Sequence, residues 1–293
     1  MLKKQEFYKL LEKGPLFLDG ATGSNLQKAG MPRGCCTEQW ILDHPTALAA
    51  LQGRYADAGS HIVYAPTFQA QPIALAKVGL EQSTEKINKS LVDFSRQSAP
   101  GCLIAGNLTT LAAFTDSFDE GNMELMIENY RRQIVGLLEG GADLLAAETL
   151  MYPTEAEAIL TAAELEGAET VFYTFTMQSD GSLFSGREAG PILRELEQAG
   201  AAAVGFNCVA ADRFTPGLVS KLRRYVKGPL ICKPNAGTPY IGSDNLPVYP
   251  MEEQEFADIL AQCHQMGANI LGGCCGTSPD YIRAVKQRIL SKP

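Results

Sequence analysis

Short apolar runs recur along the chain, and each is followed at once by small or polar residues and then by a helical pattern. Apolar runs of this length, bounded by polar residues, are typical of strands that are buried on both faces of a parallel sheet. The chain contains eight of them, at residues 15–18, 61–64, 102–105, 143–147, 170–175, 202–206, 229–232 and 269–272. The pattern therefore predicts eight buried strands that alternate with helices.

Amphipathic stretches between the apolar runs supply the predicted helices. Residues 123–141, 153–167 and 252–267 repeat apolar positions at helical spacing, and each stretch ends at a glycine, as helices commonly do. Residues 1–14 also form an amphipathic helical pattern. Eight strand–helix units fit a closed (β/α)8 barrel, or TIM barrel, formed as a single domain by residues 1–293. An open doubly wound sheet of five or six strands is the alternative.

Composition and charge narrow the class of protein. Of the 293 residues, 45% are hydrophobic and 20% are charged, as in an ordinary globular protein. The net charge of −8 argues against a nucleic-acid or anionic-membrane partner. No apolar run is long enough to span a membrane, and the N-terminus lacks the apolar segment of a secretory signal. Eight cysteines without an export signal indicate reduced thiols and a cytoplasmic location.

Three cysteines follow predicted strands. Cys208 ends the sixth strand, and the pair Cys274 and Cys275 ends the eighth. Because (β/α)8 barrels build their active sites at the carboxyl ends of the strands, we expect these sulfurs to share one rim. Glycines on both sides of the pair let the backbone turn both sulfurs toward one point. Three thiolates that leave a fourth position open suit a catalytic zinc ion, Zn²⁺.

The other cysteines and the three histidines lie away from polar strand ends, and we interpret them as structural or surface residues. They are Cys35, Cys36, Cys102, Cys232, Cys263, His44, His61 and His264. A hydrolytic zinc site would prefer histidine or carboxylate ligands and a water molecule, whereas thiolate ligands keep a bound substrate thiolate electron-rich. The pattern therefore favours a reaction on a thiol.

Four motifs, in this order, resemble the homocysteine S-methyltransferase family. That family includes betaine– and S-methylmethionine–homocysteine methyltransferases and the homocysteine-binding module of cobalamin-dependent methionine synthase. The motifs are LDGATG at residues 18–23, Asn207-Cys208, KPNAG at residues 233–237 and GGCCGT at residues 272–277. The resemblance covers nearly the whole chain. It implies a zinc-dependent enzyme, with Cys208, Cys274 and Cys275 as ligands, that methylates the thiolate of homocysteine to give methionine.

The resemblance also implies how the substrate is held. The turn of Asp19, Gly20 and Ala21 would hold the amino-acid end of homocysteine together with Glu148, and Asn235 would lie near the open position of the metal. Backbone amides in a glycine-rich turn suit a carboxylate, and a glutamate suits an ammonium group. Structural roles stay open: a turn for Asp19, a helix N-terminal charge for Glu148 and loop hydrogen bonds for Asn235.

The run after the second strand departs from part of the family. Residues 65–70 read Ala-Pro-Thr-Phe-Gln-Ala where methionine synthases carry Thr-Asn-Thr-Phe, and the Phe-Gln-Ala part is closer to the S-methylmethionine-using branch. Thr67 in this run is a further expected substrate contact. With no folate domain, cobalamin motif or dinucleotide fingerprint in the sequence, a small sulfonium donor is favoured, with Phe68 and Tyr240 as cation hosts. A separate methyl-corrinoid protein, or methylcobalamin, stays open as the donor.

Two other classes of protein are alternatives. Lys233 ends the seventh strand and is a candidate Schiff-base lysine of an aldolase-like barrel. That alternative leaves the three cysteines unexplained. A non-enzymatic zinc-binding protein is the second alternative, and it would not need the Asp19 turn or Glu148.

Overall fold

Eight parallel strands form the central sheet of the computed structural model, which describes residues 1–115, 118–243 and 246–291. In sheet order they are β1 (Leu16–Phe17), β10 (Ile270–Leu271), β7 (Leu230–Asn235), β6 (Ala203–Ala210), β5 (Val171–Phe175), β4 (Leu144–Leu150), β3 (Leu103–Thr109) and β2 (Ile62–Tyr64). A parallel bridge between Leu18 and Ile62 joins the two ends of the sheet and closes the barrel. The predicted (β/α)8 barrel is confirmed, and the open-sheet alternative is wrong.

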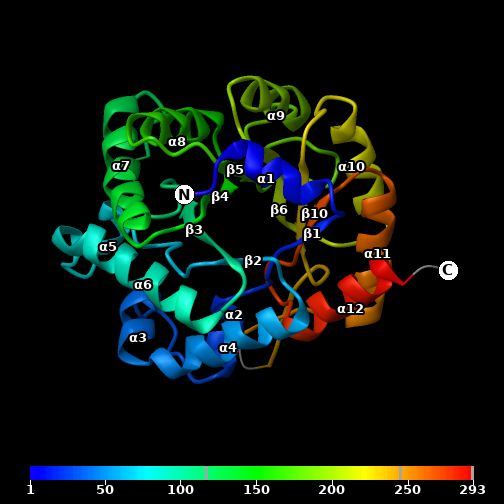
Figure 1. Cartoon of the computed structure of the whole chain (residues 1–293), viewed down its shortest axis with the longest axis horizontal. Helices are drawn as coiled ribbons and strands as arrows, with labels where there is room; N and C mark the ends of the chain where they lie inside the picture. Colours follow the sequence, from blue (N-terminus) through cyan, green and yellow to red (C-terminus); the bar gives the residue numbers. More distant parts are fainter. Residues whose placement is uncertain (116–117, 244–245, 292–293) are drawn as a thin grey trace.

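Helices surround the strands (Figure 1). They are α1 (Lys4–Leu11), α2 (Gly23–Lys28), α3 (Thr37–Asp43), α4 (Pro45–Ala58), α5 (Pro72–Ala76), the 3₁₀ helix η1 (Glu81–Ser83), α6 (Thr84–Ser98), α7 (Met123–Glu139), α8 (Pro153–Leu165), α9 (Ala189–Gln198), α10 (Thr215–Arg223), α11 (Glu253–Gln265) and α12 (Pro279–Leu290). The predicted helices correspond to α1, α7, α8 and α11. Gly141, Gly167 and Gly267 follow the last three with positive φ, as expected of helix-ending glycines. None of the helices in the described part of the chain is long and apolar enough to cross a membrane.

The strands bury both faces, and their side chains alternate between two apolar clusters. In β2, Ile62 and Tyr64 belong to the cluster inside the barrel, and Val63 belongs to the larger cluster shared with the surrounding helices. In β4, Leu144 and Leu145 divide in the same way. This period of two explains why the strands read as continuous apolar runs in the sequence.

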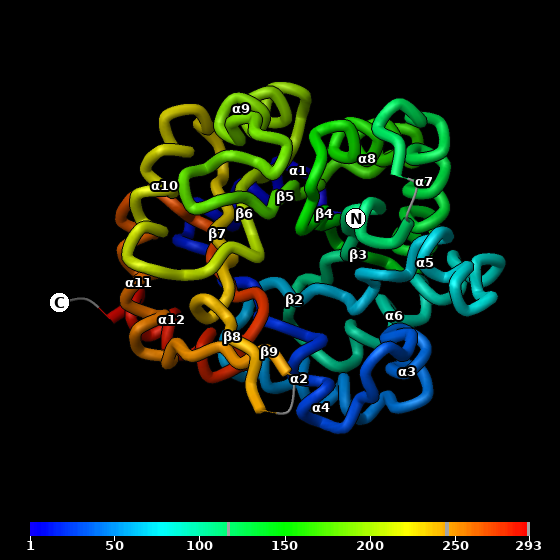
Figure 2. The backbone as a smooth tube through the Cα atoms, turned by 180° about the vertical axis from the view of Figure 1, so that it is seen from behind, coloured from blue at the N-terminus to red at the C-terminus, as the bar shows by residue number. Residues whose placement is uncertain are grey.

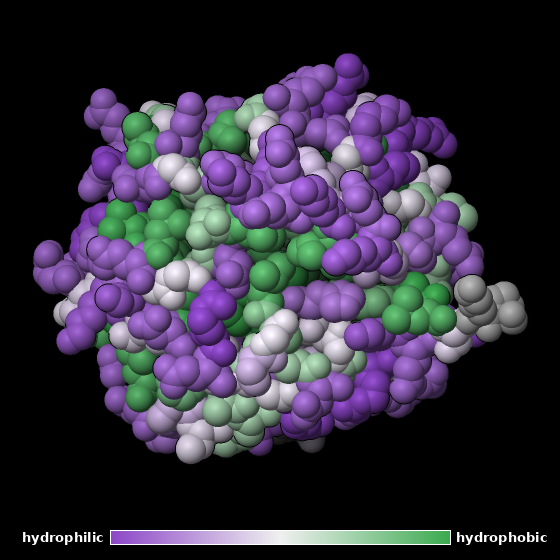
Figure 3. Space-filling view, in the orientation of Figure 1, coloured by the Kyte–Doolittle hydropathy of each residue, from purple (hydrophilic) through white to green (hydrophobic). Residues whose placement is uncertain are grey.

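Helix α1 closes the amino-terminal end of the barrel and lies across the strands in Figure 1. Its Phe7 is fully buried and packs against Phe172 of β5, with ring centroids 5.0 Å apart. Burial of a phenylalanine side chain contributes roughly 1.5–3 kcal/mol to folding. Figure 3 shows the same face as mostly hydrophilic, with hydrophobic side chains grouped in its middle. This apolar packing closes the amino-terminal end of the barrel. The polar carboxyl ends of the strands lie at the opposite end.

The carboxyl-terminal end also carries an antiparallel hairpin that the sequence pattern did not predict. It pairs β8 (Tyr240–Ile241) with β9 (Pro247–Val248). Figure 2, seen from behind, shows this hairpin beside α2. Side chains of the two segments line a common surface pocket. The hairpin therefore borders the rim on which the predicted site residues lie.

Strands β4 and β6 are irregular at their carboxyl ends. The register shifts between Ala147 and Leu150 in β4, and between Asn207 and Ala210 in β6. Within these bulges Thr149 has φ 59° and Cys208 has φ 58°, which is uncommon for residues other than glycine and strained for a β-branched one. Bulges of this kind re-aim side chains beside functional sites. Both lie on the rim that holds the cysteines.

Candidate active site

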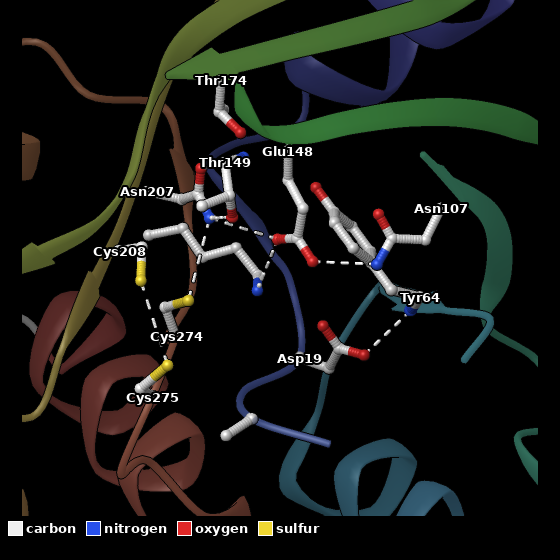
Figure 4. A network of polar contacts seen from close by, with 12 residues as sticks. Asp19, Tyr64, Asn107, Glu148, Thr149, Thr174, Asn207, Cys208, Cys274 and Cys275 are labelled. Carbon is white, nitrogen blue, oxygen red and sulfur yellow. Dashed lines mark hydrogen bonds and ion pairs between the residues drawn. The ribbon is translucent and has the colours of Figure 1, made fainter. Parts of the chain in front are cut away.

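Three sulfur atoms meet at the carboxyl-terminal rim of the barrel (Figure 4). The Sγ atoms of Cys208, Cys274 and Cys275 all lie within 4.8 Å of one another, and those of Cys208 and Cys275 are 3.9 Å apart. A tetrahedral metal with sulfur bonds of about 2.3 Å spaces its ligands about 3.8 Å apart. The structure thus brings together the three cysteines chosen from the sequence, at a spacing that fits one metal ion.

The end of β7 holds the backbone of the cysteine pair. The Cys274 amide donates to the Pro234 carbonyl at 2.7 Å, and the Ala236 amide donates to the Cys275 carbonyl at 3.0 Å. The Asn235 Oδ1 accepts a hydrogen bond from the Cys275 amide at 3.0 Å. Asn235 therefore places a metal-site cysteine through its backbone. That Asn235 lies near the open coordination position of a bound metal stays a prediction.

Hydrogen bonds among the thiols polarise the cluster. Those from Cys208 and Cys274 lower the pKa of the Cys275 thiol to about 3. The contacts with Cys274 and then with Cys275 raise the pKa of Cys208. The three thiols thus lie close enough to share protons with one another. Such a set gives up its protons to a metal that binds thiolates.

The other cysteines do not join this cluster. Cys232 and Cys263 are buried, as predicted. Cys102 was expected within a strand, but it precedes β3, where it is half-buried and its sulfur donates to the Ser60 carbonyl at 3.2 Å. The apolar run at residues 102–105 begins one residue before β3, so the apolar pattern alone placed the start of the strand one residue too early.

Glu148 lies near the end of β4 and is 7% exposed. Its Oε1 accepts a hydrogen bond from Asn107 Nδ2 at 2.8 Å, and its Oε2 forms an ion pair with Lys233 Nζ at 3.1 Å. Burial raises the pKa of Glu148, and Lys233 opposes this shift. Burial alone would lower the pKa of Lys233, but Glu148 and other anionic groups outweigh it and raise the pKa well above its usual value. Lys233 therefore stays protonated, which makes it a poor Schiff-base nucleophile.

Asn207 connects the two strand bulges. Its Oδ1 accepts a hydrogen bond from the Thr149 amide, and its Nδ2 donates to Thr149 Oγ1, both at 2.7 Å. The same Nδ2 lies 3.5 Å from Glu148 Oε2 and 3.7 Å from Cys274 Sγ. Figure 4 shows Asn207 between the carboxylate and the sulfurs. This amide therefore lies between the Glu148 carboxylate and the three-cysteine cluster.

The predicted Asp19 turn lies on another wall. Asp19 is 1% exposed; its Oδ2 accepts from the Tyr64 amide at 2.8 Å, and its Oδ1 has no hydrogen-bond partner among the described residues. Burial raises the pKa of Asp19 to about 7, although Lys233 acts to lower it. At Gly20 a Cβ atom would lie 2.6 Å from Thr277 Oγ1, so only glycine fits. The Ala21 amide already donates to the same Thr277 oxygen at 3.2 Å.

These groups line one cavity of about 260 Å³. Its lining includes the Asp19 turn, Glu148, Lys233, the three rim cysteines, Phe68 and Gln69. Thr67 is not among the lining residues, because its hydroxyl is bonded to the backbone of Asn107 at 2.9 Å. Of the two predicted cation hosts, Phe68 lines the cavity, whereas Tyr240 lies on the exposed hairpin.

Sequence reasoning missed several residues of the cavity wall, among them Asn107, Thr149 and Glu38. Asn107 and Thr149 each follow a predicted strand by two residues, after the runs 102–105 and 143–147, so the strand-end rule alone would have included them. Glu38 gave no such signal, because an acidic residue in the first turn of a helix is ordinary. In the structure Glu38 is 1% exposed and lines the cavity.

The fold and the site together define a (β/α)8 barrel with a cluster of three cysteines, spaced as metal ligands are, that opens onto a carboxylate-lined cavity. A sequence model of the homocysteine S-methyltransferase family matches residues 16–289. The chain belongs to this family. The resemblance drawn from the motifs is confirmed, and so is the predicted enzyme class, because methylation of homocysteine is the reaction that defines the family.

Individual relatives share little sequence identity with this chain, but they match nearly all of it. The chain is 28% identical to homocysteine S-methyltransferase of Escherichia coli, over 93% of this chain and 94% of the relative. It is also 28% identical to methionine synthase of Mycobacterium leprae, over 91% of this chain but only 24% of that longer protein. The metallated form of the E. coli homocysteine methyltransferase MmuM superposes with a TM-score of 0.80 at 25% identity, covering 96% of this chain and 98% of that one.

Proposed function

We propose that this chain holds a zinc ion on Cys208, Cys274 and Cys275 and methylates homocysteine with a sulfonium donor such as S-methylmethionine. The observation that carries the proposal is the meeting of three thiols on a cavity whose other walls hold carboxylates. An all-sulfur donor set suits zinc, and the existence of a metallated form of the E. coli relative supports a bound metal. Bound zinc would supply the Lewis acidity that keeps the homocysteine thiol deprotonated at neutral pH.

The amino-acid end of homocysteine is assigned to the Asp19 turn and Glu148. Asp19 and Glu148 together with Lys233 leave one negative charge in excess, which one ammonium group balances. Lys233 and Asn107 fix the Glu148 carboxylate, so little side-chain entropy is lost when the ammonium binds. The turn amides of Gly20 and Ala21 face the substrate carboxylate in this proposal. Because Thr277 already engages the Ala21 amide, Gly20 is the stronger candidate.

Two predicted contacts take supporting roles in this proposal. Thr67 bonds both the amide and the carbonyl of Asn107, which in turn donates to Glu148. Asn235 bonds the Cys275 amide. Each residue thus positions a group that faces the substrate or the metal.

Methyl transfer then needs little help from acids or bases. The thiol proton is released to solvent as homocysteine binds. The thiolate sulfur attacks the methyl carbon, and the electron pair of the broken carbon–sulfur bond stays on the donor sulfur, which leaves as a neutral thioether. An anion and a cation neutralise each other, so little new charge has to be stabilised. The residues of this chain therefore act mainly by binding and orienting, with Phe68 offering its ring to the cationic donor.

A methyl-corrinoid donor is the alternative, and the similarity to a methionine synthase supports it. Such a donor, either a separate corrinoid protein or methylcobalamin, would approach the same rim. The test is to supply homocysteine to the zinc-loaded enzyme with S-methylmethionine, S-adenosylmethionine, betaine or methylcobalamin, and to measure methionine. We expect turnover with S-methylmethionine. Methionine formed from methylcobalamin or a methylated corrinoid protein, and from no sulfonium donor, would overturn the sulfonium assignment.

We further propose that residues 1–293 act as a single homocysteine-binding barrel domain in the cytoplasm. A site built on three reduced thiols suits a reducing compartment, and the five remaining cysteines are also free.

A further inference from the structure

The charges that line the cavity do not balance. Its lining contains the carboxylates of Asp19, Glu38 and Glu148, and the basic residue among the described lining residues is Lys233. Lys233 pairs with Glu148 at 3.1 Å. A buried carboxylate is costly unless a cation or strong donors compensate it. With its three carboxylates ionised, the cavity therefore holds more negative charge than one bound ammonium group neutralises.

Glu38 is the carboxylate that the homocysteine assignment does not use. Its Oε1 accepts a hydrogen bond from the Gln69 amide at 2.7 Å, and its Oε2 lies 3.7 Å from the Cys36 sulfur. Both partners are neutral. Burial raises the pKa of Glu38 to about 7, which shows how poorly this site compensates a negative charge. A cation that entered the cavity would supply the missing partner.

Glu38 and Phe68 lie on the same wall. Phe68 directly precedes Gln69, whose amide donates to the Glu38 carboxylate, and both Phe68 and Glu38 line the cavity. An aromatic face next to a carboxylate is a combination that recognises sulfonium and ammonium groups. Helix α3 and the segment after β2 carry this wall, whereas β4 and β7 carry Glu148 and Lys233.

We propose that Glu38, together with Phe68, binds the positive charge of the methyl donor and so selects cationic donors over neutral ones. The inference rests on the proposed function, because it names the part of the same cavity that receives the donor. A neutral donor gains nothing from the carboxylate. A sulfonium donor gains an ion pair with a carboxylate that is 1% exposed, where screening by water is weak.

The decisive variant is Glu38→Gln in the zinc-loaded enzyme. Glutamine keeps an oxygen that can accept from the Gln69 amide and removes only the charge. We expect the KM for S-methylmethionine to rise tenfold to a hundredfold, as loss of a charge-assisted contact implies, while the KM for homocysteine changes less than twofold. Calorimetric titration of S-methylmethionine without homocysteine should show the same loss of affinity. Asp43→Asn is the matched control, because it removes an exposed charge from the same helix and should change neither constant.

The outcomes separate this inference from the proposed function. If wild-type enzyme turns over S-methylmethionine and Glu38→Gln leaves its KM and affinity unchanged, the role of Glu38 is overturned and the sulfonium assignment stands. If wild-type enzyme neither binds nor uses a sulfonium donor, the donor assignment falls and the inference falls with it. A Glu38→Gln protein that loses zinc or homocysteine affinity in equal measure would show a structural role and would also overturn the inference.

Discussion

The two walls of the cavity differ in how their polar groups are paired. On the wall built by β4, β6 and β7, Glu148 pairs with Lys233, and Asn207 makes two hydrogen bonds to Thr149. On the facing wall, Asp19 and Glu38 are buried carboxylates that form no ion pair among the described residues. The paired wall is preorganised and adjoins the cluster of Cys208, Cys274 and Cys275. The unpaired wall keeps negative charge available for ligands that bring positive charge.

The strongest way to break the paired wall is to remove its sulfurs. We expect the double substitution Cys274→Ala and Cys275→Ala to abolish both zinc binding and methionine formation. The barrel should still fold, because its two apolar clusters do not include these cysteines. Elemental analysis, circular dichroism and the methyl-transfer assay measure the three properties. Cys35→Ala is the control and should keep about one zinc per chain; zinc held at full stoichiometry in the double variant would refute the ligand assignment.

Removing the charge of Glu148 tests what the paired wall contributes to substrate binding. Glu148→Gln should raise the KM for homocysteine roughly tenfold to a hundredfold, since a charge-assisted contact is worth about 1.5–3 kcal/mol. Zinc content should not change, because Glu148 is not among the clustered cysteines. The KM for S-methylmethionine should change little, which makes this variant the counterpart of Glu38→Gln. An unchanged homocysteine KM would exclude the ammonium-binding role.

Asn207 in the β6 bulge holds the β4 bulge through its two hydrogen bonds to Thr149. Asn207→Ala removes both bonds to Thr149 and should lower the free energy of unfolding by roughly 1–3 kcal/mol, measured by urea denaturation. It should also weaken zinc binding without abolishing it. In a Thr149→Gly background the loss should be smaller, because glycine adopts φ 59° without strain. Strictly additive losses in this double-mutant cycle would show that the bridge does not hold the strained residue.

The smallest expected effect belongs to the unpaired wall and appears as a pH dependence of stability. Burial raises the pKa of Glu38 from its ordinary 4.5 to about 7. The folded state therefore binds more protons than the unfolded state between these values, so this contribution to stability is complete below about pH 4.5 and is lost as the pH rises through 7. In wild type the free energy of unfolding should fall between pH 5 and 7, and in Glu38→Gln this fall should be smaller by roughly 1–2 kcal/mol. A slope identical to that of wild type would show that Glu38 is not a strained carboxylate.

The sequence by itself determined the barrel and the gathering of Cys208, Cys274 and Cys275 at one rim. Strands buried on both faces must be apolar throughout, so local composition reveals them, and a barrel brings all their carboxyl ends to one rim. Cys208 and the Cys274-Cys275 pair followed from that rule alone. The positions of Asp19 and Glu148 on the cavity followed in the same way.

Only the tertiary structure decided how the polar groups are paired. The partnership of Glu148 with Lys233 and the bridge from Asn207 to Thr149 join residues on different strands, and no local pattern encodes them. The same holds for Glu38, which looks like an ordinary first-turn acid until α3 packs its carboxylate against the Gln69 amide on the cavity wall. Hydrophobic periodicity reports which face of an element is buried. The partner of a buried charge depends on which elements meet there, and the folded barrel alone fixes that.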